Sequence, residues 1–214
     1  MTRSLLLAAL LAVPAAAEPP RILFIGDSHS VGPFGQELDR LLRETGASVL
    51  TRAVCASAPR SWVAGTRHHC GFFYRDADGA TRRGTKEAST PPLAGLLSQH
   101  NAAWTVVQLG GNLHGGAPAT VKAQVGDLAR RVAEAGSKCL WVGPPNRRDN
   151  GGGFDAWYAA IKEGADPYCV FLDSRPVTPY PPMGGDGIHY GGPAGTATAK
   201  AWAAAAERRM RGGP

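Results

Sequence analysis

The 214-residue sequence lacks the short motifs that usually mark metal and nucleotide sites. Its four cysteines include no closely spaced pair, which argues against a structural zinc site. No H-E-x-x-H or comparable ligand spacing is present, so His68, His69 and His114 are interpreted as surface histidines. The glycines at 151–153 and 191–195 lack the lysine and the strand context of a phosphate-binding loop. We therefore expect no metal, cofactor or nucleotide.

Long hydrophobic runs are missing beyond the first residues of the chain. Arg3 is followed by an apolar run from Leu5 to Val13 and by three alanines before Glu18, a pattern typical of a secretory signal peptide. A membrane anchor would need about 20 apolar residues, and this run is shorter. We therefore expect residues 1–17 to be removed and residues 18–214 to form a single soluble domain with no stable membrane anchor, secreted or periplasmic.

The chain has only a mild excess of positive charge, with a net charge of +6 at pH 7. Most lysines and arginines are scattered, and one polar segment holds a small cluster: Arg67, Arg75, Arg82, Arg83 and Lys86. No aromatic-basic motif of a nucleic-acid-binding module accompanies this cluster. A solvated basic face is favoured, and no nucleic-acid partner is expected.

The cysteine count is even, which in an exported chain suggests two disulfides. Three pairings are possible. Cys139 and Cys169 each lie in an apolar, strand-like run, and such runs can be neighbours in a sheet, whereas Cys55 and Cys70 flank one loop. The favoured pairings are therefore Cys55 with Cys70 and Cys139 with Cys169, while buried free thiols are the alternative.

Short apolar runs alternate with helical patterns along the chain, as in proteins with a parallel sheet covered on both faces. The expected strands are Ile22–Ile25, Val49–Val54, Trp104–Leu109, Leu140–Val142 and Cys169–Leu172. The expected helices are Gly35–Arg43, Ala119–Ala135 and Ala194–Met210. These patterns predict an α/β three-layer sandwich with a five-stranded parallel sheet of the flavodoxin type, in which ligands bind beyond the carboxyl ends of the strands.

The segment from Pro59 to Pro92 departs from this alternation because it is long, polar and interrupted by glycines. Phe72–Tyr74 and Asp78-Gly79 within it indicate a small hairpin. We expect the segment to form a loop over the sheet edge that helps to shape a substrate site.

A serine follows the first expected strand directly, in the order Gly26-Asp27-Ser28-His29-Ser30. A hydroxyl at the point where a buried strand ends and a helix begins makes Ser28 the candidate nucleophile. Such a serine needs a base, an orienting acid and donors for the oxyanion. Asp27 is expected to bond within the turn, and His29 either contacts substrate or packs.

The candidate base and acid lie in Asp186-Gly-Ile-His189, between the fifth strand and the last helix. Asp186 would hold one ring nitrogen of His189 so that the other can accept the serine proton. Asn112, after the third strand, is a candidate oxyanion donor, together with the N–H of Ser28 and an N–H in the turn near Ala56. Taken one at a time, these residues have simpler interpretations. Asp186 and His189 could belong to a surface turn in which the aspartate caps a helix, and Asn112 could be an ordinary turn residue.

Taken together and in this order, Gly26-Asp27-Ser28, Gly110-Gly111-Asn112 and Asp186-Gly-Ile-His189 resemble the motifs of the SGNH (GDSL-type) hydrolase superfamily. The resemblance implies Ser28 as nucleophile, His189 as base, Asp186 as orienting acid and Asn112 among the oxyanion donors. His29 is similar to the version of the first motif in polysaccharide-modifying relatives. One position departs from the family, because the usual glycine donor is matched by Ala56 within Cys55–Pro59.

The expected function is that of an exported serine esterase that works through an acyl-enzyme. Its expected substrates are small acyl esters, such as acetyl groups on a cell-wall or surface polysaccharide. Two alternatives stay open: an O-acyltransferase with the same triad, and a carbohydrate-binding envelope protein without turnover.

Overall fold

The strands of the protein form one large and one small sheet in the computed structural model, which describes residues 18–212. The large sheet has seven strands in the order β5-β4-β2-β1-β7-β8-β9. These are β1 (Arg21–Gly26), β2 (Ser48–Val54), β4 (Phe72–Arg75), β5 (Thr81–Gly84), β7 (Trp104–Gln108), β8 (Lys138–Val142) and β9 (Val170–Leu172). A second sheet pairs β3 (Arg67–His68) with β6 (Ala88–Ser89).

Five neighbouring strands of the large sheet, β2-β1-β7-β8-β9, are parallel. In chain order these strands read 2-1-3-4-5, which is the flavodoxin-type order. The predicted three-layer α/β class and its five parallel strands are confirmed. The predicted total of five strands is wrong, because the hairpin β4–β5 pairs antiparallel with the outer edge of β2.

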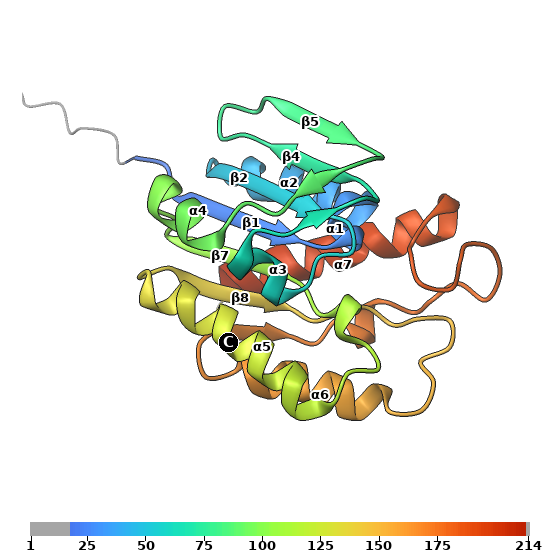
Figure 1. The fold of residues 1–214 in the computed structure, drawn as a ribbon. Coiled ribbons are helices and arrows are strands. Elements are labelled where there is room, and N and C mark those ends of the chain that lie inside the picture. Colours follow the sequence, from blue (N-terminus) through green and yellow to red (C-terminus); the bar gives the residue numbers. More distant parts are fainter. Residues whose placement is uncertain (1–17, 213–214) are drawn as a thin grey trace, which may run out of the picture.

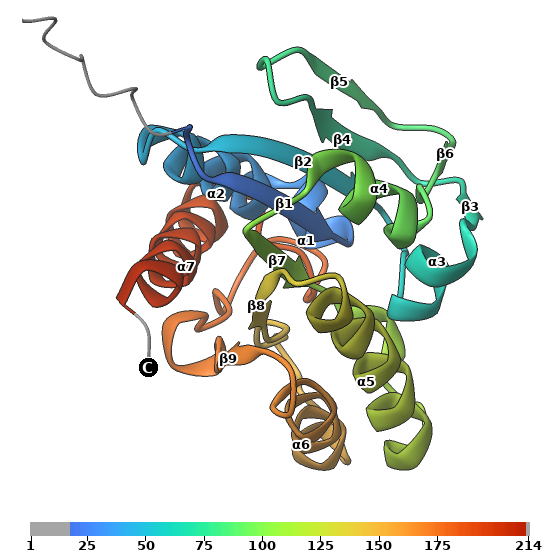
Figure 2. The ribbon, with the colours of Figure 1, turned by 90° about the vertical axis from the view of Figure 1, so that its left-hand side faces the viewer.

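Helices cover both faces of the sheet. They are α1 (Ser28–Val31), α2 (Pro33–Glu44), α3 (Pro59–Ala64), α4 (Leu93–His100), α5 (Pro118–Glu134), α6 (Phe154–Ala165) and α7 (Gly192–Gly212). Two one-turn 3-10 helices, η1 (Gly111–Leu113) and η2 (Arg175–Val177), lie in loops. Figures 1 and 2 show α2 and α7 on one face, and α3, α4, α5 and α6 on the other.

The central strands are buried on both faces, and successive side chains enter different cores. Ile22 and Phe24 of β1 pack with the side chains of α2 and α7, including Trp202. Leu23 and Ile25 pack with the helices of the opposite face, including Val125 of α5. Because both faces need apolar side chains, the strands read as continuous hydrophobic runs rather than alternating patterns.

The three helices expected from the sequence correspond to α2, α5 and α7, with ends shifted by one or two residues. Three further helices, α3, α4 and α6, were not predicted. For α6 a signal was present, since Phe154, Trp157, Tyr158 and Ile161 recur at helical spacing and are buried. The segment from Pro59 to Pro92 was expected to be a loop, but it contains helix α3 and strands β3, β4, β5 and β6.

Two disulfides join the cysteines in the pairs that the sequence favoured. Cys55, after β2, bonds to Cys70, before β4, with Cα atoms 5.5 Å apart. Cys139 in β8 bonds to Cys169 beside β9, with Cα atoms 4.4 Å apart. The first bond lies near the carboxyl end of β2, and the second joins two neighbouring parallel strands.

The predicted signal peptide, residues 1–17, lies outside the described residues. Within residues 18–212, no helix combines the length and hydropathy that crossing a bilayer requires.

Candidate active site

Ser28 is the first residue of the short helix α1, directly beyond the carboxyl end of β1. The preceding Asp27 caps this helix by accepting a hydrogen bond of 3.0 Å from the N–H of His29. The turn requires glycine at position 26, because a Cβ there would lie 2.0 Å from the Ser30 Oγ. Ser30 in turn donates to Gln108 Oε1 of β7 at 2.8 Å. The nucleophile segment, residues 26–30, is thus fixed to the central strands.

His189 and Asp186 complete a hydrogen-bonded chain with Ser28. His189 Nε2 lies 2.9 Å from Ser28 Oγ, and His189 Nδ1 lies 2.6 Å from Asp186 Oδ2. The other Asp186 oxygen accepts hydrogen bonds from the N–H groups of Ile188 and His189. Burial alone would raise the pKa of Asp186, but these hydrogen bonds and the His189 ring outweigh it and hold the pKa well below its usual range. Asp186 is therefore ionised and able to stabilise a charged imidazole.

The second histidine of the site, His29, packs behind the first. Its buried ring lies 5.2 Å from the His189 ring and 5.8 Å from the Trp202 ring, measured between centroids. Burial, with the nearby His189 and Arg147, lowers the pKa of His29 to about 3. His29 is therefore neutral at physiological pH and supports the His189 ring by packing.

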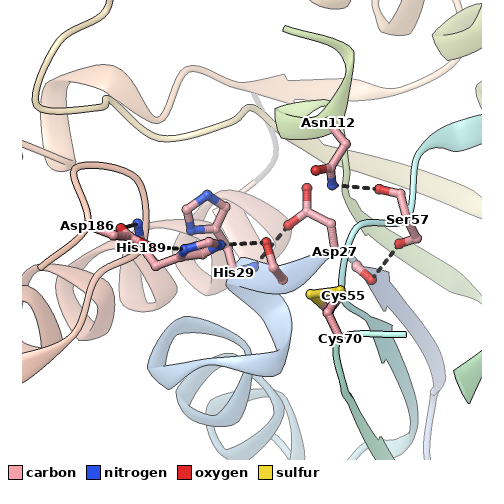
Figure 3. The surroundings of a disulfide bond; sticks show 10 residues. Asp27, His29, Cys55, Ser57, Cys70, Asn112, Asp186 and His189 are labelled. Atoms are coloured by element: carbon pink, nitrogen blue, oxygen red, sulfur yellow. Dashed lines mark hydrogen bonds and ion pairs between the residues drawn. A yellow bond between two sulfur atoms is a disulfide. The ribbon is translucent and has the colours of Figure 1, made fainter. Parts of the chain in front are cut away.

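Asp27 and Asn112 lie across the site from Asp186 (Figure 3). Asp27 is fully buried, and this burial raises its pKa to about 7 against the hydrogen bond from the N–H of His29. Asn112, in η1, donates from Nδ2 to the carbonyl oxygen of Ser57 at 3.0 Å. Ser57 also donates to the carbonyl oxygen of Gly26 at 3.3 Å, so the turn after β2 is tied to the end of β1.

Two neighbouring cavities open around these groups. A small one of about 110 Å³ is lined by Ser28, Asn112, His189 and Arg147, among others. A larger one of about 340 Å³ lies next to it, and the two share Arg147 and Ile188 in their linings. Room for a small acyl group therefore adjoins room for a larger substrate moiety.

Comparison with known proteins gives no match to a family model or to a curated protein, but it gives clear structural neighbours. A protein proposed to be an SGNH hydrolase, from Slackia heliotrinireducens, is 16% identical with a TM-score of 0.57, covering 90% of this chain and 100% of that chain. A catalytic mutant of the acetylxylan esterase Axe2 from Geobacillus stearothermophilus is 13% identical with a TM-score of 0.55, covering 87% and 94%. A GDSL-like lipase from Bacteroides thetaiotaomicron is 13% identical with a TM-score of 0.56, covering 92% and 93%.

The chain has the SGNH hydrolase fold. The comparisons confirm the resemblance drawn from the motifs at the level of the fold, although identities below a fifth carry no residue roles. The structure itself brings Ser28, His189, Asp186 and Asn112 to one edge of this fold, at the carboxyl ends of the parallel strands.

Ala56 is the position at which the sequence departs from the usual SGNH pattern. Its backbone has φ of 62°, a conformation that favours glycine, and its side chain is exposed. Within residues 18–212 its N–H has no hydrogen-bond partner, which leaves it free to donate. Its role as an oxyanion donor stays a prediction.

Arg147 is the site residue that sequence reasoning missed. It lies two residues after Pro145, in the loop after β8, and it lines both of the cavities described above. The signal that identified Ser28 and Asn112, a polar residue just beyond a buried strand, applies here as well. Its charge alone does not distinguish it from the scattered arginines of the surface.

The three histidines that the sequence predicted to be surface residues, His68, His69 and His114, line neither of the two cavities. His114 is exposed and packs against the Trp157 ring, and His69 lies 3.4 Å from a Glu87 carboxylate oxygen. His68 is half-buried, and burial lowers its pKa. Across residues 18–212 no group of three or more histidine, cysteine or acidic side chains is arranged to hold a metal ion.

Proposed function

We propose that the protein is a serine esterase that hydrolyses small acyl esters through an acyl-enzyme. The observation that carries the proposal is the hydrogen-bonded chain Ser28–His189–Asp186, with distances of 2.9 Å and 2.6 Å. A base in contact with a hydroxyl and oriented by a carboxylate is the arrangement that activates serine as a nucleophile.

In the proposed reaction, Ser28 Oγ attacks the ester carbonyl carbon while His189 Nε2 takes the hydroxyl proton. The Asp186 carboxylate stabilises the resulting imidazolium and keeps the ring in position. His189 then returns the proton to the departing alcohol oxygen, and an acyl group remains on Ser28. Water, deprotonated by His189, attacks this acyl-enzyme, and the carboxylic acid leaves as Ser28 regains its proton.

The oxyanion that forms in both steps needs donors. The backbone N–H of Ser28 has no hydrogen-bond partner within the part of the chain that the structure describes. Asn112 lines the same small cavity, and one N–H of its amide is engaged with Ser57, so the second remains for the oxyanion. We assign these two groups, with the N–H of Ala56, as the donors.

The small cavity supports acetyl as the acyl group, because a volume of about 110 Å³ suits a small group. Two disulfides support export to an oxidising compartment, in line with the predicted cleavage after Ala17. An acetylxylan esterase among the structural neighbours supports an acetylated polysaccharide as substrate class.

The direct test is hydrolysis of 4-nitrophenyl acetate together with labelling by a fluorophosphonate probe. We expect turnover and labelling by the wild-type protein, and neither by Ser28→Ala. Ser98→Ala, which removes an exposed hydroxyl from α4, is the matched control and should behave as wild type. Labelling that persists in Ser28→Ala would remove Ser28 from the mechanism, and a wild-type protein that neither labels nor turns over would contradict the esterase assignment.

A further inference from the structure

Arg147 places a cation beside the candidate nucleophile. It is half-buried and lines the small cavity together with Ser28, Asn112 and His189. Its Nη2 donates to the carbonyl oxygen of Gly111 at 2.9 Å, and its guanidinium carbon lies 5.9 Å from the centre of the Trp157 ring. One of the five N–H donors of the guanidinium is thereby engaged.

Five other half-buried arginines differ from Arg147 because they pair with carboxylates: Arg43 and Arg75 with Asp39, Arg52 with Asp76, Arg130 with Asp127, and Arg175 with Asp173. Arg147 has no carboxylate oxygen within 4.0 Å among residues 18–212. Removing a cation from water without a counter-charge is costly, so an unpaired guanidinium in a cavity is suited to receive an anion.

The loop that carries Arg147 is held firmly in place. The N–H of Arg147 donates to Asn150 Oδ1 at 2.9 Å. Asn146, one residue earlier, donates from its backbone N–H to Thr178 Oγ1 and from its side chain to the carbonyl oxygen of Arg175. The guanidinium is therefore presented by a fixed backbone, which lowers the ordering cost of binding.

Three acidic groups line the cavities beside Arg147, and none of them forms an ion pair with it. Asp27 is fully buried: its Oδ1 accepts from the N–H of His29, while its Oδ2 has no hydrogen-bond partner among residues 18–212, and its charge acts on Arg147 from beyond ion-pair distance. Asp186 accepts from the ring and the backbone of His189. Asp149 is exposed and accepts from the N–H of Gly151. The larger cavity is lined by Arg147 and Arg148 together with Asp149 and Asp186, so the attraction for an anion is local to the Arg147 guanidinium and is not a property of the whole lining.

We propose that Arg147 determines specificity by binding a carboxylate on the alcohol part of the substrate, so that the preferred substrates are O-acylated hexuronates or chains of them. This inference rests on the proposed esterase function. The alcohol part is assigned because Arg147 lines both cavities: the 340 Å³ cavity has room for a sugar, and the 110 Å³ cavity would take the acyl group.

The test compares three mono-esters: acetylated methyl galacturonosides, the corresponding acetylated methyl galactosides, and methyl galactosides that carry a hemisuccinyl group. We expect kcat/KM to be about ten- to a hundredfold higher for the acetylated uronosides than for the acetylated galactosides, the range of a charge-assisted hydrogen bond. Arg147→Gln should bring this ratio close to one, and Arg147→Lys should keep part of it. Arg131→Gln removes the same charge from the far end of α5 and should leave the ratio unchanged.

Any of three results would overturn the inference. The first is a wild-type protein with no preference for the uronosides. The second is an Arg147→Gln variant in which kcat/KM falls equally for all three esters, and the third is a preference for the hemisuccinyl ester. A failure of the esterase function is distinguishable, because binding is measured separately in Ser28→Ala by titration with unacetylated oligogalacturonate and with oligogalactan. Tighter binding of oligogalacturonate that Arg147→Gln abolishes supports the inference, and equal binding of both contradicts it.

Discussion

The two halves of the candidate triad are built in opposite ways. The nucleophile segment, residues 26–30, ends the central strand β1 and is almost wholly buried, with Ser30 bonded to β7. The base loop, residues 183–189, is mostly exposed and contains three glycines with positive φ, and Met183 in it is 84% exposed. Few side chains hold this loop, and the hydroxyl of Tyr180 contacts two of its backbone groups.

This difference separates two kinds of mutational effect. Changes in the nucleophile segment disturb a packed core, so they should affect the free energy of unfolding as well as activity. Changes in the base loop meet little packing, so they should affect activity while leaving stability nearly unchanged. Each prediction below sharpens or breaks this contrast.

The largest effect is expected in the base loop, from Asp186→Asn. The amide keeps the shape of the side chain but cannot stabilise the His189 imidazolium, so kcat should fall by about 10³- to 10⁴-fold. The free energy of unfolding, measured in urea, should change by less than about 1 kcal/mol because the side chain is half exposed. Asp166→Asn, an exposed carboxylate of the α6 C-terminus, is the control. An active Asp186→Asn variant would show that His189 needs no carboxylate.

The second effect is a loss of stability in the nucleophile segment, from Gly26→Ala. The added methyl group would lie 2.0 Å from Ser30 Oγ and 2.4 Å from Ser30 Cβ. Overpacking of this kind should destabilise the fold by about 3 kcal/mol, measured by urea unfolding. Ser30→Gly in the same chain removes both contacts and should restore part of the loss.

Gly95→Ala serves as the matched control for this substitution. Gly95 lies in α4, and a Cβ there meets nothing within 4 Å. Since alanine is the better helix former, this variant should gain up to about 1 kcal/mol. If Gly26→Ala behaved like Gly95→Ala, the nucleophile segment would not be packed as tightly as the structure shows.

A third effect follows from the buried carboxyl of Asp27. Its folded-state pKa of about 7 exceeds the ordinary value of 3.8, so the folded protein retains a proton that the unfolded chain releases between these values. The stability that this proton provides is complete below pH 3.8 and is lost as the pH rises through 7. Asp27→Asn removes the titration, so its stability relative to wild type should improve by on the order of 4 kcal/mol between pH 4 and pH 8. Parallel curves of unfolding free energy against pH would contradict the buried, ionisable state of Asp27.

The same contrast explains what the sequence could predict. Buried parallel strands appear as continuous apolar runs, so β1, β7 and β8 and the residues at their ends were identifiable, including Ser28 and Asn112. The spacing of Asp186 and His189 indicated their contact because a three-residue separation lets the carboxylate reach the ring across one turn. The fold class followed from the order of these elements.

Other features depend on contacts that have no sequence pattern. The hairpin β4–β5 is polar on its outer strand and gains its place by pairing with β2, so its addition to the sheet was not predicted. Arg147 reaches the site because its loop is tied to Thr178 and to the carbonyl oxygen of Arg175, which lie about 30 residues later. The place of Arg147 after a buried strand could have marked it as a candidate, but these long-range hydrogen bonds, which direct its loop to the site, leave no pattern in the sequence.

The smallest effect tests how the base loop is held. The Tyr180 hydroxyl donates to the carbonyl oxygen of His189 at 2.9 Å and accepts from the N–H of Gly187 at 3.0 Å. Tyr180→Phe removes both bonds, so the loop should sample positions in which His189 is out of reach of Ser28. We expect kcat to fall by about three- to tenfold, equivalent to roughly one hydrogen bond, with KM for 4-nitrophenyl acetate nearly unchanged.

Tyr168→Phe, which removes a hydroxyl from a side chain that is 41% exposed, should leave kcat at the wild-type value. If the two variants gave the same kcat, the loop would be positioned by its glycine turns, by the Asp186–His189 contact and by the hydrogen bonds that Arg148 donates to Gly184 and Gly187. If Tyr180→Phe instead lowered the free energy of unfolding by as much as Gly26→Ala does, the base loop would be part of the packed core. The contrast between an embedded nucleophile and a lightly held base would then not apply.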